Sequence, residues 1–468
     1  MNRDELAQLT KEQLIDLIFQ QAEQLAHLQT VLQKLQADYE ALKLKFEQTQ
    51  KPPTTSRNSS QPPSRDQKGN TSTTKSRKRH GPPQGHEKHE RRFVAQPDQV
   101  VDLHRTVCEG CQGDLTHAGG RMVKVNQITE LPESQAQVIE VRQYETACPR
   151  CGRVQRGDVP AGLNLERAFG TRLEATVVYY RQIQHMSYER TQQALWDLYG
   201  VELSQGGIDG IMQRAKDQGL QKVEAIHQAV CHSPVIHSDE THSRVKGDNW
   251  WEWVFCTTTA VLHVIRFNRS EDIIREVMGV FRAEVWVSDC YGPQLKAPAD
   301  RRQLCLSHQL RNLEAVVETH PQLRWPRAIQ FLFRAAIHLH HQRDQLDPEA
   351  FAQQVARVEC HCDRLLQRSL DPPDARRLQR RYLKYRQNLF VFLYRCDVEP
   401  TNNVAERALR PSVIHRKVTG CFRSEWGAKG YAALASVIDT AELNGVHAFQ
   451  AIQSLLGVPS LPIPLAGE

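Results

Sequence analysis

Three acidic residues, far apart in the sequence, each lie where a secondary-structure element is expected to end or begin. Asp239 follows a short apolar run in VIHSDETHSRV, and Asp289 follows a second run in AEVWVSDCYG. Glu406 lies in PTNNVAERALRP, where Pro400 and Asn403 indicate a helix start. Taken singly, the two aspartates are ordinary turn residues, and Glu406 is the capping-box partner of Asn403.

Taken together, the three carboxylates indicate a site that binds divalent metal ions for phosphodiester chemistry. Two divalent ions about 3.5–4 Å apart can activate the attacking oxygen and stabilise the leaving oxygen of a phosphodiester. Mg²⁺ prefers hard oxygen ligands such as carboxylates. We therefore predict that Asp239 bridges two ions and that Asp289 and Glu406 each complete one. The adjacent Glu240 should point to the other face of its strand. The nucleophile would be water for cleavage, or a DNA 3′-hydroxyl for strand transfer.

Basic residues follow the third acid. Arg410 lies one helical turn after Glu406 and should share its face. Further cations come next, and a DNA-binding role, with contacts to phosphates, is predicted for this group. For Arg407, ordinary surface charge is an equally good interpretation. The predicted phosphate-binding cations are Arg410, Arg416, Lys417 and Arg423.

A Cys-x-x-His pair, Cys305 and His308, follows Asp289 by about fifteen residues. It fits half of a zinc site completed by Cys360-x-Cys362. It also fits a helix that faces the acids, with His308 near the phosphate of bound DNA. We favour the second interpretation.

The strand pattern around the first two acids indicates how they are positioned. Strand-like runs occur at 234–238, 250–257, 260–267 and 284–288, with the first ending at Asp239. A helix is expected over 270–281, with Ser270 as its N-cap and Val280 and Phe281 on its apolar face. Three strands, a helix and a fourth strand ending in Asp is the order of a ribonuclease-H-like α/β core.

Four cysteines form a second candidate metal site. Cys108-x-x-Cys111 and Cys148-x-x-Cys151 are separated by 36 residues with strand-like sequence. Two close thiolate pairs suit tetrahedral Zn²⁺, so we predict a structural zinc ribbon. Redox-active pairs are a weaker interpretation, because two such pairs at this distance would be coincidental.

Residues 161–230 look helical. A helix that stops at Gly200 and another that starts after Ser204 as N-cap fit a helix-turn-helix, but a plain helical bundle fits as well. Several glycines in the second helix weaken the pattern.

The N-terminal region predicts a coiled coil. Apolar positions from Ile18 to Phe46 alternate in steps of three and four, with polar Gln21 at one core position. We expect this seam to form a homo-oligomer, although packing on the chain's own domain would also use it. Residues 51–95 then carry 11 Lys/Arg against 3 Asp/Glu, so the rest of the chain sums to −2 of the total +6. This linker fits either a DNA-binding arm or a solvated spacer.

Composition narrows the class of protein. The chain has 468 residues, 40% of them hydrophobic, which is enough for several domains with a real core. No apolar run is long enough to span a membrane, and the start MNRDELAQLT lacks a signal sequence. We expect a cytoplasmic protein without membrane contact.

The predicted fold class is multidomain α+β. The expected domains are a coiled coil (leucine zipper) at 1–48, a basic disordered linker at 49–95, a zinc ribbon at 96–160, a helical DNA-binding region at 161–230, the first part of the ribonuclease-H-like core at 231–302, a helical insertion at 303–396, the second part of the core with Glu406 at 397–456, and a tail at 457–468.

With these motifs assembled, the chain resembles the large transposase subunit of the insertion-sequence 66 family over nearly its whole length. The most specific likeness is TNNVAERALRPSVIHRKVTGCFRS; SDET, SDCYG, CLSHQLRNL and the two Cys-x-x-Cys pairs add to it. The resemblance implies a DDE transposase that depends on Mg²⁺ (or Mn²⁺) and binds terminal inverted repeats, with Asp239, Asp289 and Glu406 as its acids. It also implies a bacterial, nucleoid-associated protein, and accessory proteins of the same element.

The sequence departs from the family pattern at Cys421, where Gly is expected, and in the basic arm, which lacks some glycines. Neither change removes a catalytic acid. Two alternative functions remain at this stage: a zinc-ribbon, coiled-coil DNA-binding regulator without catalysis, and a nuclease that hydrolyses strands but never joins them.

Overall fold

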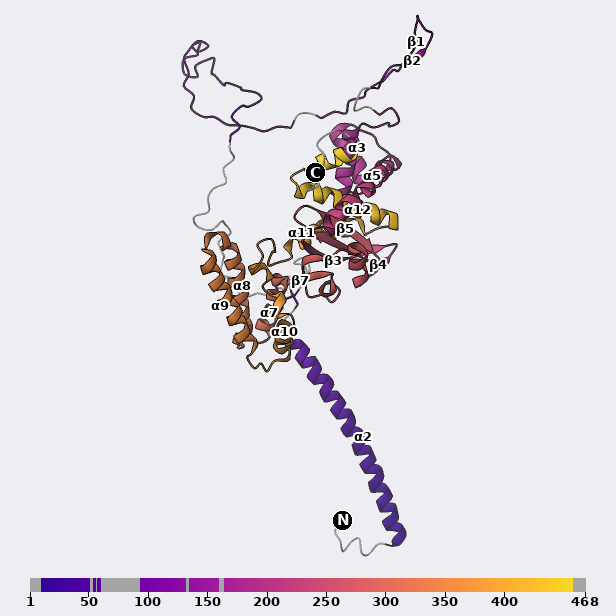
Figure 1. Cartoon of the computed structure of the whole chain (residues 1–468), viewed down its shortest axis with the longest axis vertical. Helices are drawn as coiled ribbons and strands as arrows, with labels where there is room; N and C mark the ends of the chain where they lie inside the picture. The colour runs from indigo at the N-terminus through magenta and orange to yellow at the C-terminus, as the bar shows by residue number, and fades with distance from the viewer. Residues whose placement is uncertain are drawn as a thin grey trace. The chain divides into compact units, whose positions relative to one another are not determined.

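The computed structural model describes residues 10–50, 54–55, 57–59, 93–131, 134–159 and 164–457 (Figure 1). By its internal contacts the chain divides into two compact units. The larger contains residues 1–67, 141–193 and 203–468, and the smaller contains residues 68–140 and 194–202. Most of the predicted basic linker and nearly all of the predicted tail fall outside the described residues.

A five-stranded mixed sheet is the framework of the larger unit, in the order β5-β4-β3-β6-β7. Strands β3, β4 and β5 form an antiparallel meander, β6 runs parallel to β3, and β7 runs parallel to β6. Lys246 and Gly247 join β3 to β4 with φ angles of 54° and 89°, as a two-residue hairpin loop requires. The strands are β3 Val235–Val245, β4 Asp248–Cys256, β5 Val261–Arg266, β6 Ala283–Ser288 and β7 Ala299–Leu304.

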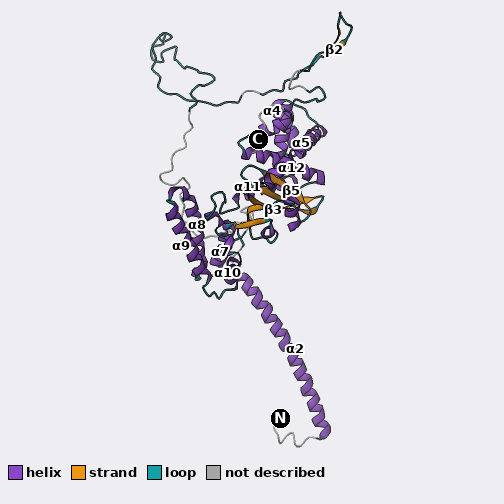
Figure 2. Ribbon diagram, viewed as in Figure 1, coloured by secondary structure: helices purple, strands orange, loops and turns teal. Residues whose placement is uncertain are grey.

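Helices surround this sheet, drawn in purple around the orange strands in Figure 2. Helices α5 and α12 pack on each other and on β5, while α11 packs on β3 and β4. The helices other than the N-terminal one are α3 Thr171–Gln182, α4 Tyr188–Tyr199, α5 Gln205–Cys231, α6 Glu271–Met278, α7 Leu306–Thr319, α8 Arg324–His341, α9 Pro348–Leu366, α10 Pro373–Lys384, α11 Asn403–Thr419, α12 Glu425–Leu443 and α13 Ala448–Leu455.

The helical insertion shares a hydrophobic core with the sheet. Val235, Val285 and Leu304 of the strands are buried in one cluster with side chains of α7 to α10, including Leu313 and Tyr382. In Figure 1 these orange helices gather near β7. Because the insertion is packed on the strands, it can hold side chains at fixed positions near the carboxyl end of β6.

Several expectations about the core need correction. The strand that contains Asp239 does not end there: it continues to Val245, because β4 pairs with it beyond the point where β6 stops. The expected helix over 270–281 ends at Met278, where Gly279 adopts a positive φ, so Val280 is exposed rather than buried. The sequence analysis also missed β7, because ADRRQL is too polar to read as a strand.

Two predicted helix caps are confirmed. The Ser270 hydroxyl accepts a hydrogen bond from the Asp272 N–H at the start of α6, and the Ser204 hydroxyl accepts one from the Gly207 N–H at the start of α5. Helices α4 and α5 are present in the region for which a helix-turn-helix was suggested, and that motif stays a prediction.

The N-terminal segment forms a single helix, α2 Lys11–Gln50. Within the chain its predicted seam is exposed, at Leu25, Leu28, Leu32, Leu35, Tyr39 and Leu42. None of the helices in the described part of the chain combines the length and the apolar character that a membrane span needs.

Candidate active site

The register of the sheet brings Asp239 and Asp289 to neighbouring positions. On β3 and β6, Val235 lies beside Val285 and His237 beside Val287, so Asp239 and Asp289 each come two residues after the last of these pairs, Asp289 just past the end of β6. Because side chains alternate along a strand, Asp239 projects from the same face as His237. Asp239 also lies opposite Val254 of β4, and we call the sheet face that carries these residues the acid face.

Helix α11 covers the acid face and delivers Glu406. Its residues Ala405 and Leu409 pack on Val254 and Cys256. Glu406 lies in the first turn of the helix, whose N-cap is Asn402. The three acids (Asp239, Asp289 and Glu406), which we call the acid cluster, therefore come from β3, the end of β6 and the start of α11.

Asn402 fixes the start of this helix in a way that the sequence analysis did not predict. Its side-chain amide donates to the Ser238 carbonyl at 2.9 Å, next to Asp239, and its backbone N–H donates to the Cys305 sulfur at 3.1 Å. The N-cap is Asn402 and its side chain makes no cap, so the alternative interpretation of Glu406 as the capping-box partner of an Asn403 N-cap does not apply. The side-chain amide of Asn402 instead links α11 to β3.

The acids repel one another in a poorly solvated place. Burial, followed by the negative charges of Glu240, Asp289 and Glu406, raises the pKa of Asp239 well above its ordinary value. Its Oδ1 accepts a hydrogen bond from the adjacent Glu240 N–H at 2.9 Å, and Asp289 Oδ1 accepts one from the Tyr291 N–H at 2.8 Å. No cation is paired with either aspartate among the described residues, so the cluster keeps unbalanced negative charge.

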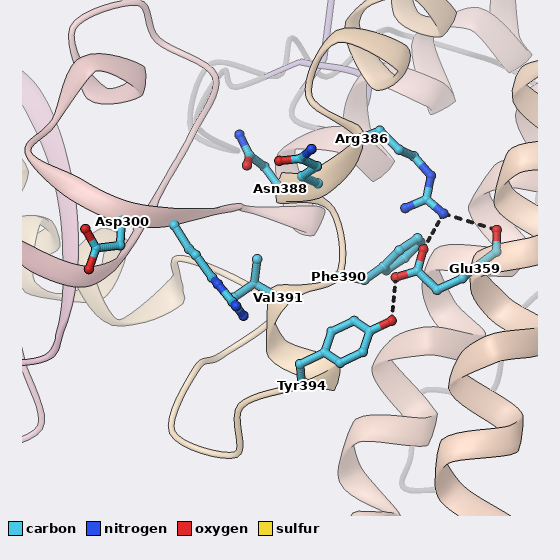
Figure 3. A pocket seen from close by; sticks show the side chains of 9 residues that line it. Asp300, Glu359, Arg386, Asn388, Phe390, Val391 and Tyr394 are labelled. Atoms are coloured by element: carbon cyan, nitrogen blue, oxygen red, sulfur yellow. Dashed lines mark hydrogen bonds and ion pairs between the residues drawn. The ribbon is translucent and has the colours of Figure 1, made fainter.

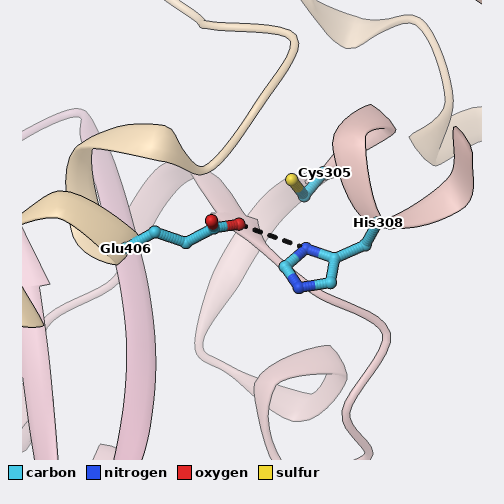
Figure 4. A group of neighbouring side chains, drawn as sticks. All are labelled: Cys305, His308 and Glu406. Atoms are coloured by element: carbon cyan, nitrogen blue, oxygen red, sulfur yellow. Dashed lines mark ion pairs between the residues drawn. The ribbon is translucent and has the colours of Figure 1, made fainter. Parts of the chain in front are cut away.

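Cys305, His308 and Glu406 form a second small group beside these acids (Figure 4). Their ligand atoms all lie within 4.8 Å of one another, and His308 Nδ1 is 3.5 Å from Glu406 Oε1. Arg311, one turn further along α7, is 3.4 Å from the other oxygen of Glu406. This supports the interpretation in which the Cys-x-x-His helix faces the acids.

The alternative zinc site with the other cysteine pair finds no support in the geometry. Cys362 is buried in the apolar core, and Cys360 is exposed. In the described part of the chain, no group of ligand-type side chains joins either of them to Cys305 or His308. Burial raises the pKa of the Cys305 thiol to about 11, as expected for a thiol used in packing.

The carboxylates are of the type that suits divalent cations that prefer oxygen. Asp239 lies near enough to Asp289 and Glu406 for their charges to raise its pKa, but in the described part of the chain the side chains whose ligand atoms lie within 4.8 Å of one another are Cys305, His308 and Glu406. Glu406 Oε1 and His308 Nδ1 are buried without a hydrogen-bond partner among the described residues. Buried carboxylates without cations are costly, and a hard divalent ion is the partner that removes this cost.

Two comparisons identify the family. A family model described as "Transposase IS66 family" matches residues 166–430, more than half of the chain, and contains the acid cluster. A second, "zinc-finger binding domain of transposase IS66", matches residues 105–152. The chain belongs to the IS66 family of transposases. A comparison with curated proteins gives no match.

The zinc-finger match covers both Cys-x-x-Cys pairs of the transposase. At each pair the first cysteine and the fifth residue after it close a turn: Cys108 N–H donates to Gly113 O, and Cys148 N–H donates to Arg153 O, each at 2.9 Å. The residue after each second cysteine has a positive φ, 57° at Gln112 and 74° at Gly152. The two turns thus have one conformation.

The electrostatics of the two pairs also agree. Backbone N–H groups of the same turn lower the pKa of the first cysteine in each pair, those of Cys111 and Gly110 acting on Cys108, and those of Arg150 and Cys151 acting on Cys148. A lowered thiol pKa favours the thiolate that zinc binds. The family match therefore indicates zinc, and the four cysteines lie within the matched residues. Between and beside the turns the described strands are short, β1 Glu145–Ala147 and β2 Val154–Arg156.

Glu240 and Arg269 show what the sequence analysis missed near the acids. Glu240 projects from the opposite face, as predicted, where Arg269 Nε donates to it at 2.9 Å and the Gln294 amide at 2.7 Å. Arg269 is stacked over Tyr291, 3.8 Å from the ring centroid. It thereby links the segment after Asp289 to β3. Only the fold brings these residues together, since no local pattern marks Arg269.

The cations predicted to contact phosphates occupy different environments. Arg410, Lys417 and Arg423 are exposed, whereas Arg416 is half-buried and its Nη1 has no hydrogen-bond partner among the described residues. His308 lies with the acids instead of on the outer surface.

A cavity of about 500 Å³ lies elsewhere in the transposase, and two of its charged side chains, Glu359 and Arg386, are paired with each other (Figure 3). Its Arg386 is held by Glu359 and by Asp363, and Tyr394 donates to Glu359 at 3.1 Å. These charges are already balanced, and none of the three acids lines the cavity. The cavity lies between β7 and the insertion. It is lined by Asp300, Arg301, Glu359, Arg386, Gln387, Asn388, Phe390, Val391 and Tyr394.

Proposed function

We propose that this transposase cleaves DNA at the terminal inverted repeats of its element and joins the freed ends to target DNA, by two-metal phosphoryl transfer. The observation that supports the proposal is the acid cluster: carboxylates from β3, the end of β6 and the start of α11 that repel one another, with no cation paired with either aspartate among the described residues. Such a cluster suits a divalent-ion site better than a structural ion pair.

The strand order supports a ribonuclease-H-like core. An antiparallel meander of three strands, followed by two parallel strands on the β3 side, gives the order β5-β4-β3-β6-β7. Two of the acids then lie on the neighbouring central strands. The helical insertion lies between the second acid and the third, so Glu406 reaches the site only after the chain returns to the sheet.

In the proposed mechanism, Asp239, Asp289 and Glu406 would hold the ions, Asp239 both of them and the other two one each. Bound Mg²⁺ or Mn²⁺ supplies activation of the attacking oxygen and stabilisation of the leaving oxygen. Asn402 keeps Glu406 beside Asp239 through the Ser238 carbonyl. Arg311 lies beside Glu406, where its charge can attract a substrate phosphate.

DNA is the partner that the family implies. We propose that Arg410, Arg416, Lys417, Arg423 and His308 bind its phosphates, that the zinc ribbon and the α4–α5 segment position the repeats, and that structural Zn²⁺ holds the ribbon. A homo-oligomer through α2 is supported by the seam that the chain leaves exposed. Dependence on accessory proteins of the element is part of the proposal.

The proposal is tested by Asp289→Asn in the full-length, zinc-loaded protein. We expect Mg²⁺-dependent cleavage of a repeat-end duplex to be lost, with thermal unfolding and repeat binding unchanged. Asp300→Asn, an exposed aspartate on β7, is the matched control and should cleave normally. Full cleavage by Asp289→Asn would refute the assigned site. Repeat binding by the wild-type protein without any nicking would favour the non-catalytic regulator.

A separate assay distinguishes a transposase reaction from simple hydrolysis. A pre-cleaved end with a free 3′-hydroxyl is mixed with labelled target DNA and Mg²⁺. Covalent joining of end to target is expected, and hydrolysis without joining would assign the protein to the nuclease class.

A further inference from the structure

Helix α10 carries the densest group of unbalanced cations in the described insertion. Its twelve residues, PDARRLQRRYLK, contain five Lys/Arg and one acid, Asp374. Asp374 is already engaged, because His320 Nε2 lies 3.0 Å from it. The cations therefore have no acid on their own helix to balance them.

The helix has two opposite faces. Ala375, Leu378 and Tyr382 are buried in the core shared with the sheet. The outward-facing cations, which we call the α10 stripe, are Arg376, Arg377, Arg380 and Lys384. In the described part of the chain, no carboxylate forms an ion pair with any of them. Elsewhere in the insertion, buried or bridging arginines such as Arg386 do have acidic partners.

The cations of the α10 stripe destabilise the helix that carries them. Arg376 and Arg380 are four residues apart, as are Arg380 and Lys384, so like charges face each other along one side. Such pairs destabilise a helix unless an anion lies across them. A bound polyanion would relieve the repulsion between these neighbouring cations.

The stripe is connected to the acid cluster through one packing contact. Helix α10 packs on α7, which carries His308 and Arg311 toward Glu406.

We propose that the α10 stripe binds the phosphate backbone of duplex DNA that extends from the acid cluster, without reading its sequence. The inference rests on the proposed function, since it concerns the same DNA. A helix of twelve residues is about 18 Å long, roughly half a turn of B-form DNA. Three or four cations along that length match a run of phosphates on the duplex.

The test compares two triple variants of the full-length, zinc-loaded protein. The first is Arg376→Gln, Arg377→Gln and Arg380→Gln. The matched control is Arg334→Gln, Arg357→Gln and Arg364→Gln, three exposed arginines on α8 and α9. Binding to a labelled repeat-end duplex is measured by fluorescence anisotropy without Mg²⁺, over a series of salt concentrations.

For the α10 triple variant we expect the slope of log affinity against log salt to become shallower by about 2–3, since each lost phosphate contact removes about 0.9. Affinity should fall at least about tenfold at low salt, equally on the repeat end and on an unrelated duplex. The control should match the wild type. The triple Arg→Lys variant on α10 should keep the wild-type slope, which separates charge from folding.

An unchanged slope in the α10 triple variant would overturn the inference, as would a loss confined to the repeat sequence. A stripe that serves an acidic protein instead of DNA would also appear as an unchanged slope. These outcomes are independent of catalysis. If the wild type cannot cleave DNA, the proposed function fails, but the salt slopes still decide whether α10 binds duplex.

Discussion

Two clusters of carboxylates lie on the same face of one sheet and differ in how their charge is balanced. The acid cluster has no cation at either aspartate. Glu252 of β4 and Asp439 of α12 instead enclose His263 of β5, whose two ring nitrogens lie 2.9 Å from their oxygens. We call these three residues the histidine cluster. Val254 lies between the clusters, paired with Asp239 on one side and with His263 on the other.

The surroundings of the histidine cluster complete its bonding. Ser412 of α11 donates to Glu252 at 2.7 Å and lies 3.2 Å from the Tyr431 hydroxyl of α12. Burial alone would lower the pKa of His263, but the hydrogen bonds to Asp439 and Glu252 raise it to about 10. A buried charge that is fully partnered supports the fold, whereas a buried charge without a partner is retained for something that binds.

Helix α11 connects the two clusters. Glu406 in its first turn joins the acid cluster, and Ser412 six residues later contacts the histidine cluster. The balanced cluster thus anchors the helix whose beginning completes the unbalanced one.

The largest effect is expected from Asp239→Asn. Cleavage of a repeat-end duplex should fall by roughly three orders of magnitude or more, because the proposed bridging ligand is lost. The metal-free protein should meanwhile become more stable to urea, by about 1–2 kcal/mol, because like-charge repulsion is relieved. If Asp239→Asn lost both activity and stability, Asp239 would have a structural role like that of the residues in the histidine cluster.

The opposite result is expected from His263→Leu. Two carboxylates are left buried without their cation, so the free energy of unfolding should fall by about 3–5 kcal/mol. Urea unfolding measures this loss. The double variant with Glu252→Leu should recover part of it, and a purely additive double variant would contradict the coupling.

Mg²⁺ should stabilise the protein by binding the acid cluster and not the histidine cluster. At saturating concentration, with zinc held constant, it should stabilise the wild type by about 1–3 kcal/mol, because it binds the folded acid cluster alone. Thermal unfolding with and without Mg²⁺ measures the shift. Asp239→Asn should lose it, while His263→Leu should keep a shift of similar size from its lower starting point.

The pH dependence of stability should report the histidine cluster. A histidine whose pKa is raised from 6.5 to about 10 adds stability that is fully present below pH 6.5 and is lost as pH rises through 10. The stability difference between wild type and His263→Leu should therefore shrink over that window, as followed by urea titrations. A constant difference would mean that His263 is not the charged partner.

The smallest effect concerns Cys421, beside the histidine cluster. Its φ of 80° is a left-handed conformation, and its neighbour Phe422 stacks on His415 and contacts Tyr431. Cys421→Gly should stabilise the protein by about 1 kcal/mol, because Gly adopts this φ without strain. Cys421→Ala is the matched control: it removes the thiol but keeps the strain, and should give no gain in denaturant unfolding.

The sequence predicted much of the core because its signals are local. Apolar runs marked β3 to β6, and Ser204 and Ser270 marked two helix starts. It failed where tertiary contacts outweigh local preference. The polar strand β7 is stable because it pairs with β6 and is covered by the insertion, and Asn402 leaves its cap position unfilled to reach Ser238.

Residue types and spacing alone predicted the three acids and the paired cysteines, because the chemistry of metal ligands limits which residues can serve, and they carried the resemblance to IS66 transposases that the family match confirms. Cys421 was also marked by sequence as a departure from Gly, and its positive φ supplies the reason. Only the tertiary structure decided that Asp239 and Asp289 follow paired residues of neighbouring strands, that α11 links two unlike clusters, and that α10 turns its cations outward. Those facts depend on strand register and packing between distant segments, which no local pattern encodes.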